Sequence, residues 1–271
     1  MLTFVPTPIG NIADISLRTL EVLSKTDVIL CEDTRVTKQL LFILQDRYNL
    51  KINPNLQFIS LHSHNEKEFI EKLSPSFFEK NVVYVSDAGM PVVSDPGALL
   101  VAYMQENNIE YDVLPGANAV LTAYVASGFN ANQFLFWGFL PHKGKERTLS
   151  LNNALYSGYV TILYEAPHRL QKLLKEISSI DKKREIFLAK ELTKKYQKYF
   201  KGTALELLEE LQNNFKGEWV VILDKSLTCK NNVSSITTED IMALEIPKKQ
   251  KAKLISKLTG QNVKEVYGEL I

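Results

Sequence analysis

The sequence predicts an α/β protein built from two α/β domains and a small helical tail. Short runs of apolar, often β-branched residues alternate with longer segments whose apolar residues recur at helical spacing. Runs such as Val82–Val85 and Trp219–Leu223 are apolar at every position, which is typical of strands covered on both faces. A chain of 271 residues is long for one core and sufficient for two. We expect mostly parallel sheets whose carboxyl ends converge on one cleft, or on two facing clefts.

Composition narrows the classes of protein. With 45% hydrophobic and 23% charged residues the chain is typical of a soluble globular protein, and no apolar run approaches the ~20 residues that cross a bilayer. The formal net charge is +1, so a nucleic-acid-binding region would have to be local. Cys31 and Cys229 are far apart and lack metal-ligand spacing, and no signal peptide is recognisable. We therefore expect a cytoplasmic protein without a metal.

The first domain, residues 1–116, is predicted from apolar runs that each end in a polar turn. These strand-like runs cover residues 2–5, Val28–Cys31, 57–61, Val82–Val85 and 111–114. Helical periodicity follows in residues 14–23, in 37–44, after Glu66 and in Ala98–Glu106. For the last helix, Asp95 is the expected N-cap and Pro96 the first helical residue.

The second domain, residues 117–225, repeats the alternation of strands and helices. Strands are expected at 134–140, 160–164, 185–189, 200–203 and Trp219–Leu223, and helices at Ala119–Ser127, 170–177 and 205–211. Residues 141–147 form a basic, glycine-containing segment, expected to be a mobile loop that is either solvated or suited to phosphates. Residues 226–271 are expected to be a polar linker, beginning near Asp224, and a tail with a basic amphipathic helix at 247–258 that Gly260 ends. That helix either binds RNA or docks on the second domain.

Polar and charged groups gather just past several predicted strands. They are Glu32–Arg35, His62–Glu66, the loop 86–91, Glu165–Arg169 and Lys190–Lys194. Such clusters are either solvated strand ends or groups that face a substrate in the cleft. His62 and His64 have no further ligands nearby that would complete a metal set. The chain also lacks G-x-G-x-x-G and a P-loop, so a nucleotide-like ligand needs another arrangement between the domains.

A series of motifs in order along nearly the whole chain carries a specific resemblance. These are Pro6-Thr7-Pro8-Ile9-Gly10-Asn11, Glu32-Asp33-Thr34-Arg35, His64-Asn65-Glu66, Ser86-Asp87-Ala88-Gly89-Met90-Pro91, Ser94-Asp95-Pro96-Gly97, Leu114-Pro115-Gly116, Gly138-Phe139-Leu140-Pro141, Glu165-Ala166-Pro167-His168-Arg169 and Glu191-Leu192-Thr193-Lys194. The chain resembles the ribosomal RNA small subunit methyltransferase I family, of the tetrapyrrole methylase fold. Met90 stands where that family more often has Thr, and Ala117-Asn118 replaces a commoner Pro-containing pair.

The resemblance implies a reaction and a set of partners. It implies S-adenosylmethionine (SAM) as methyl donor, the ribose 2′-hydroxyl of a decoding-centre cytidine in 16S ribosomal RNA as acceptor, and a homodimer. It places the donor between the domains. The residues implied for the donor are Pro8, Asp87, Ala88, Gly89, Met90, Val92, Gly116, Ala117, Tyr164, Leu192, Glu218 and Trp219.

The acceptor hydroxyl is a poor nucleophile, so a base or a positioning group is expected beside it. The candidates are Glu32, Asp33, Glu165, His168 and Lys190. The residues expected at the RNA are Arg35, His64, Asn65, Lys143, Lys145, Arg147, Arg169, Lys248, Lys249 and Lys251. Two alternatives remain: a C-methyltransferase of tetrapyrrole precursors with the same fold, and a non-catalytic RNA-binding factor in ribosome assembly.

Overall fold

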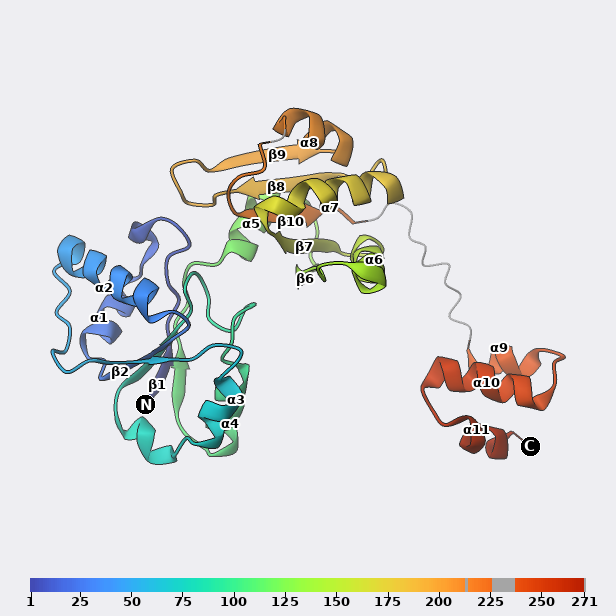
Figure 1. The fold of residues 1–271 in the computed structure, drawn as a ribbon, viewed down its shortest axis with the longest axis horizontal. Helices are drawn as coiled ribbons and strands as arrows, with labels where there is room; N and C mark the ends of the chain where they lie inside the picture. The colour runs from blue at the N-terminus through green and yellow to red at the C-terminus, as the bar shows by residue number, and fades with distance from the viewer. Residues whose placement is uncertain (213, 226–236, 271) are drawn as a thin grey trace. The chain divides into compact units, whose positions relative to one another are not determined.

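The structure is a computed structural model that describes residues 1–212, 214–225 and 237–270 (Figure 1). The chain divides into two compact units, residues 1–225 and 226–271. Most of the expected linker, at 226–236, lies outside the described residues. No helix in the described part of the chain is both long and apolar enough to cross a bilayer.

The first sheet is parallel throughout, with strand order β3-β2-β4-β1-β5. Its strands are β1 (Leu2–Phe4), β2 (Val28–Cys31), β3 (Gln57–Ser60), β4 (Val82–Val85) and β5 (Tyr111–Val113). The helices around it are α1 (Leu17–Ser24), α2 (Thr34–Tyr48), α3 (Glu66–Glu71) and α4 (Ala98–Glu106). Because side chains alternate across a strand, Val82 and Tyr84 of β4 pack toward α4 while Val83 and Val85 pack toward α1 and α2. The carboxyl ends of all its strands therefore open on one edge, as expected.

The second sheet has strand order β6-β7-β10-β8-β9, and here the expectation of mostly parallel strands is wrong. Its strands are β6 (Phe134–Phe139), β7 (Val160–Glu165), β8 (Ile186–Lys190), β9 (Lys198–Gly202) and β10 (Trp219–Leu223). Among the described strand pairs β6–β7 is parallel, while β7–β10, β10–β8 and β8–β9 are antiparallel. A short connection without a helix joins β8 to β9 and permits only antiparallel pairing, and β10 then inserts between β7 and β8.

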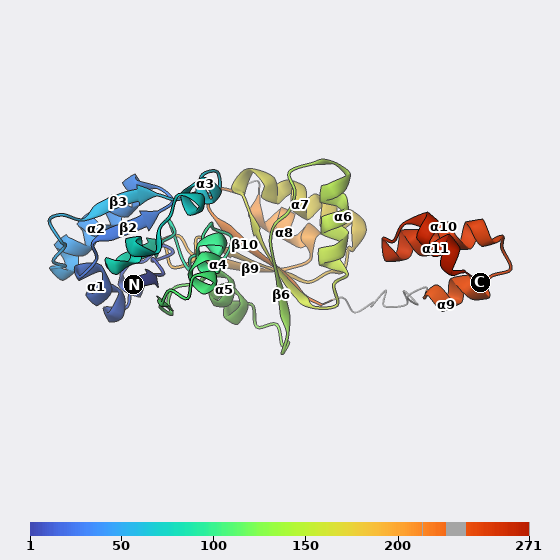
Figure 2. The same ribbon diagram turned by 90° about the horizontal axis from the view of Figure 1, so that it is seen from below.

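Helices cover both faces of this mixed sheet, which explains why its central strand β10 is apolar and buried at every position. One face packs against α6 (Gly144–Leu155), α7 (Pro167–Ile180) and α8 (Ala204–Leu211), and Figure 2 shows these helices gathered around the sheet. The other face packs against α5 (Ala119–Ser127). The helix α6 begins inside the segment 141–147 that was expected to be a mobile loop, so that expectation is wrong from Gly144 onward.

The start of α4 also differs from the sequence prediction. Its N-cap is Gly97, at φ +121°, and not Asp95. The first backbone N–H groups of the helix need an acceptor, and Glu66 of α3 supplies it. Its buried carboxylate accepts hydrogen bonds from the backbone N–H groups of Gly97 at 2.8 Å and Leu99 at 3.2 Å. Asp95 is thereby released from a capping role.

The tail unit contains α9 (Thr238–Ala243), α10 (Lys248–Thr259) and α11 (Val263–Glu269). The helix α10 buries Ala252 and Ile255 against residues of α9 and α11, and Gly260 ends it at φ +76°. The predicted basic amphipathic helix is therefore present, and its apolar side packs within its own unit.

Candidate active site

Two adjoining cavities lie where the loops of the first sheet meet the second sheet. Their volumes are about 360 and 200 Å³. They share Ile9, Ala88, Ala119, Phe139 and Tyr164, so they form one cleft pocket. The larger part is lined by Ala166, Pro167, Ala189, Leu192, Val220, Glu165, Glu218 and Trp219 in addition, and the smaller part by Gly89, Met90, Val93, Ser94, Asp95 and Asn118.

Two loops of the first sheet are tied together at this pocket. Thr7 and Gly89 exchange two backbone hydrogen bonds, each of 3.0 Å, and the Thr7 hydroxyl donates to the carbonyl oxygen of Ser86. Gly89 has φ +89°, and a Cβ atom there would lie 3.2 Å from Cγ2 of Ile9. The position therefore needs glycine both for its conformation and for the close approach of the loops, which presents bare backbone to the cavity.

The second sheet supplies an aromatic and apolar wall. Phe139 and Phe136 hold their ring centroids 5.5 and 5.1 Å from that of Tyr164. Burial raises the pKa of Tyr164 to about 12, so its hydroxyl stays protonated and acts as a hydrogen-bond donor. Ala189 and Val220 complete a surface suited to a flat, weakly polar group.

The loop after β4 supplies one carboxylate, that of Asp95, to the same pocket, and Glu32 and Asp87 are outside the lining. Burial, and next the charge of Glu32, raises the pKa of Asp95 to about 6. Burial likewise raises the pKa of Glu32 and of Asp87, and each is raised further by a neighbouring carboxylate. A cavity-facing carboxylate whose pKa lies close to neutrality is matched to proton transfer. The sequence did not indicate Asp95 as a site residue, because Asp-Pro before a helix is also an ordinary capping pattern. The acceptor at the start of α4 comes instead from Glu66, on another helix.

Asp33, a base candidate, and Arg35, expected at the RNA, pair with each other. Arg35, whose side chain is 89% exposed, pairs with Asp33 at 2.6 Å. The Arg35 hydrogen bond lowers the pKa of Asp33 to about 2, which leaves this carboxylate a poor proton acceptor. The backbone N–H of Asp33 donates to Asp87 at 3.1 Å and so fixes the end of β2 to the loop after β4.

Glu165 is held in a buried ion network on the helix-covered side of β7. Its side chain has no exposed surface and lies 2.9 Å from Nε of Arg169 and 3.5 Å from Arg147. Arg147 also pairs with Glu176 at 2.8 Å and donates to the carbonyl oxygen of Pro141. Two guanidinium groups therefore stabilise the charge of Glu165, and the network joins β7 to α6, α7 and the end of β6.

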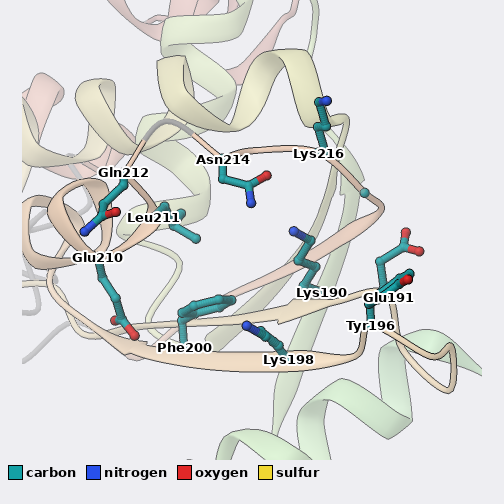
Figure 3. Close-up of a pocket in the computed structure, with 11 residues that line it drawn as sticks. Lys190, Glu191, Tyr196, Lys198, Phe200, Glu210, Leu211, Gln212, Asn214 and Lys216 are labelled. Carbon is teal, nitrogen blue, oxygen red and sulfur yellow. The ribbon is translucent and has the colours of Figure 1, made fainter.

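Two further base candidates are absent from the cleft pocket. His168 lies on the exposed side of α7 in a shallow surface groove. Lys190 lines a separate cavity, with its amino group 5.3 Å from the ring centroid of Trp219 (Figure 3). The pleat of β8 explains this, because Ala189 faces the cleft and the next residue must face the opposite side of the sheet.

The residues expected at the donor divide into two groups. Ala88, Gly89, Met90, Tyr164, Leu192, Glu218 and Trp219 line the cleft pocket. Pro8, Asp87, Val92, Gly116 and Ala117 do not line it. Gly116 acts one step away, because a Cβ atom there would lie 2.7 Å from Pro6 and separate the loops.

Arg147 contradicts its predicted place at the RNA. It is 2% exposed and its guanidinium serves the buried network, because α6 turns this side chain inward. Arg169 is also engaged, through Glu165 and the carbonyl oxygen of Leu140. Asn65 binds the backbone of His62 and Ser60 and thus shapes its own loop.

The other residues expected at the RNA are accessible. His64, Lys143 and Lys145 are exposed on the first unit. Lys248, Lys249 and Lys251 belong to α10 of the tail unit, where Lys251 donates to the carbonyl oxygen of Met242. In the described parts of both units, no three His, Cys, Asp or Glu side chains are grouped as metal ligands would be.

The profile of the tetrapyrrole (corrin/porphyrin) methylases matches residues 1–208. A solved structure of cobalt precorrin-4 methyltransferase, a cobalamin biosynthetic enzyme, has the same fold, with a TM-score of 0.58 and 16% identity over 82% of this chain and 94% of that one. Fold and pocket thus define a methyltransferase of the tetrapyrrole methylase class.

Closer relatives narrow this class. Proteins named ribosomal RNA small subunit methyltransferase I are 51% identical in Campylobacter fetus subsp. fetus (strain 82-40), covering 100% of both chains, and 46% identical in Helicobacter pylori (strain J99), covering 98% of this chain and 96% of that one. The chain belongs to the ribosomal RNA small subunit methyltransferase I family. This confirms the resemblance and the predicted fold class, and the methyl donor is SAM.

Proposed function

We propose that the protein transfers a methyl group from SAM to the ribose 2′-hydroxyl of a decoding-centre cytidine (C1402-type) in 16S ribosomal RNA. The relatives that are 51% and 46% identical carry the name of small-subunit ribosomal RNA methyltransferases. The structural observation that supports the chemistry is Asp95, a carboxylate that lines the cleft pocket with its pKa raised to about 6.

The cleft pocket fits the donor in both size and chemistry. Its apolar wall of Ala119, Ala189, Leu192 and Val220 suits the adenine, while Ser94, Asn118 and the bare backbone at Gly89 suit the polar groups. When bound, SAM supplies an electrophilic methyl group on a positively charged sulfur. Asp95 and the aromatic ring of Tyr164 place negative charge and π-electron density in the same cavity.

Asp95 is the group we assign to the acceptor. As the ribose oxygen forms its bond to the methyl carbon, the hydroxyl proton passes to the Asp95 carboxylate, and the sulfur departs with the electron pair of the broken bond. Most of the acceleration then comes from holding the two reactants in line. Glu32 lies close enough to raise the pKa of Asp95 and would receive the proton only as a substitute.

Charged residues near the cleft would hold the RNA. Arg35, His64, Lys143 and Lys145 are exposed, and each contact with a phosphate steepens the salt dependence of binding. The lysines of α10 are a second basic surface in the tail. We propose the divisions 1–116, 117–225 and 226–271 as the domains, which is supported by the packing of α5 on β8 and β10.

We further propose that the protein is a cytoplasmic homodimer. Val125 and Leu121 of α5 are 81% and 51% exposed, an apolar surface that a second copy would cover. Light scattering of the purified chain tests this directly; a monomer at micromolar concentration would contradict it.

The function is tested with labelled SAM and small ribosomal subunits that lack the modification. We expect label in 16S ribosomal RNA and a stop in primer extension at low nucleotide concentration, which reports ribose methylation. Methylation of a base nitrogen, or of a tetrapyrrole precursor in place of RNA, would contradict the proposal. Failure to bind SAM in calorimetry would favour a non-catalytic assembly factor.

A further inference from the structure

A cavity of about 560 Å³ lies apart from the cleft pocket, on the face of the second sheet that packs against α6, α7 and α8. Its walls come from the ends of β8 and β9, the end of α8 and the connection to β10. Figure 3 shows the amino groups of Lys190 and Lys198 and the amide of Asn214 turned toward the space beside the ring of Phe200. Lys216 also belongs to the lining, but Figure 3 shows its amino group turned away from this space. We call this cavity the lysine pocket.

Lys190 and Lys198 face each other directly across the antiparallel pair β8–β9. Like charges at such a position destabilise a sheet unless an opposite charge lies between or beside them. Yet neither ammonium group has a carboxylate within 4.0 Å in the described residues. Lys190 instead lies over the ring of Trp219, the neighbour on β10. The pair is thus arranged for an anion that the chain does not itself supply.

The acidic residues of the lining do not fill this role. Glu191 accepts the backbone N–H of Glu218 at 2.7 Å and pairs with Lys194 at 3.5 Å, so its charge is already used. Glu210 lies at the far wall on the last turn of α8. The ammonium groups of Lys190 and Lys198 and the one remaining carboxylate, that of Glu210, leave the lysine pocket positive, with an acceptor available for hydroxyl or amino groups.

An aromatic ring lies beside the two ammonium groups. Phe200 and Lys198 are alternate residues of β9 and therefore lie on the same face of the strand. The ring centroid of Phe200 is 5.9 Å from that of Trp219. A ring next to paired positive charges is the combination with which proteins hold single-stranded nucleic acid, by stacking on a base and pairing with its phosphate.

The lysine pocket and the cleft pocket share one edge of the sheet. Lys190, Glu191 and Gly217 line the first, while Leu192, Glu218 and Trp219 line the second. The carboxyl end of β8 and the amino end of β10 therefore separate the two cavities by a few residues. A single-stranded RNA with one nucleotide in the cleft pocket can pass around this edge and place another nucleotide in the lysine pocket.

We propose that the lysine pocket binds a nucleotide of single-stranded RNA that flanks the methylated one, with its phosphate between Lys190 and Lys198 and its base beside Phe200. This inference rests on the proposed function for the identity of the RNA. It gives Lys190, the last residue of β8, a binding role in place of the catalytic one for which it was a candidate.

The test is binding of a fluorescein-labelled, unstructured RNA of about ten nucleotides to the full chain, followed by anisotropy over a range of salt concentrations. We expect the double variant Lys190→Gln/Lys198→Gln to bind on the order of tenfold more weakly at 0.1 M salt, and the slope of log K against log salt to become shallower by about 0.7 for each lost phosphate contact. The variant Lys190→Arg/Lys198→Arg keeps both charges and should retain most of the affinity.

The matched control is Lys182→Gln/Lys183→Gln. These exposed lysines lie just before the amino end of β8, so the variant has the same net charge but leaves the lysine pocket intact. If both glutamine variants weaken binding equally, or neither does, the pocket is not the site. Photocrosslinking of 4-thiouridine RNA adds a positional result: adducts within residues 196–200 support the inference, and adducts confined to other segments overturn it.

The outcome is separable from that of the proposed function. Ribose methylation of small subunits by the unaltered chain tests the function, and RNA binding by the variants tests the pocket. Calorimetry with SAM on each variant reports whether the cleft pocket is intact. If the unaltered chain methylates ribose but the two double glutamine variants bind RNA with equal affinity, the proposed function is supported and the proposal for the lysine pocket is wrong.

Discussion

Asp95 and Glu165 look alike in the sequence and differ in the folded chain. Glu165 is the last residue of β7 and Asp95 lies in the loop between β4 and α4, and each lines the cleft pocket. Glu165 is met by two guanidinium groups from α6 and α7, whereas Asp95 is surrounded by other carboxylates and by apolar burial. The loop that carries Asp95 thus leaves a charge without a counter-charge in the cleft pocket, whereas the charge of Glu165 is paired and holds β7 to α6 and α7. The difference shows that counter-charges from distant helices decide whether a strand-end carboxylate is chemical or structural.

The largest effect is expected from Asp95→Asn. The amide keeps the shape but cannot accept the proton, so kcat/KM should fall about 10²- to 10⁴-fold. Thermal unfolding should change little, because Asp95 caps no helix. Glu165→Gln is the contrasting variant, with its main effect on unfolding. An Asp95→Asn enzyme with full activity would move the base to Glu32.

Arg147→Met should be the most destabilising of the charge variants. It removes one partner of a buried network whose side chains at Arg147 and Glu165 are 2% and 0% exposed, and the remaining carboxylates lose compensation. We expect a loss of about 3–5 kcal/mol in the free energy of unfolding, measured with urea. The control is Lys172→Met, which removes a 54% exposed partner of the same Glu176 and should cost less than about 0.5 kcal/mol. Equal losses would refute the structural role of Arg147.

The dependence of kcat/KM on pH tests whether Asp95, in contrast to Glu165, acts as the base. Only the unprotonated carboxylate accepts a proton, and its pKa is about 6, so log(kcat/KM) should fall with decreasing pH below about 6. At pH 5 the loss should be about tenfold. Glu32 and Asp87 lie nearby with raised pKa values, while Asp33 stays charged throughout this range. In Asp95→Asn the limb should disappear; if it persists unchanged, another group is titrating.

The smallest effect concerns Glu66, whose carboxylate leaves Asp95 free by serving the start of α4. In Glu66→Gln the amide oxygen still accepts the two backbone N–H groups but loses its charge at the helix N-terminus. We expect a loss of about 0.5–1 kcal/mol in the free energy of unfolding. Glu71→Gln, at the exposed end of the same helix α3, should be neutral. A neutral Glu66→Gln variant would mean that the start of α4 does not depend on the negative charge of this acceptor.

Much of the fold was predictable because the relevant signals are local. Apolar runs located every strand of both sheets to within a few residues, and helical periodicity located α4 and α5 at their observed bounds. Part of the pocket was predictable in the same way, since the loop at Gly89 and the strand end at Tyr164 do line the cleft. The site residues that failed to reach the cleft, such as Lys190 and His168, failed by one residue of strand or helix phase.

The sequence by itself determined the helices and strands, the division of the buried strands between two domains, and the family resemblance that its turn motifs carry. Tertiary structure alone decided that β10 inserts antiparallel between β7 and β8, that Arg147 turns inward to Glu165, and that Glu66 replaces Asp95 at the start of α4. The physical reason is range. Propensity and periodicity act over a few neighbouring residues, whereas strand order, counter-charges and caps depend on which distant segments the folded chain brings together.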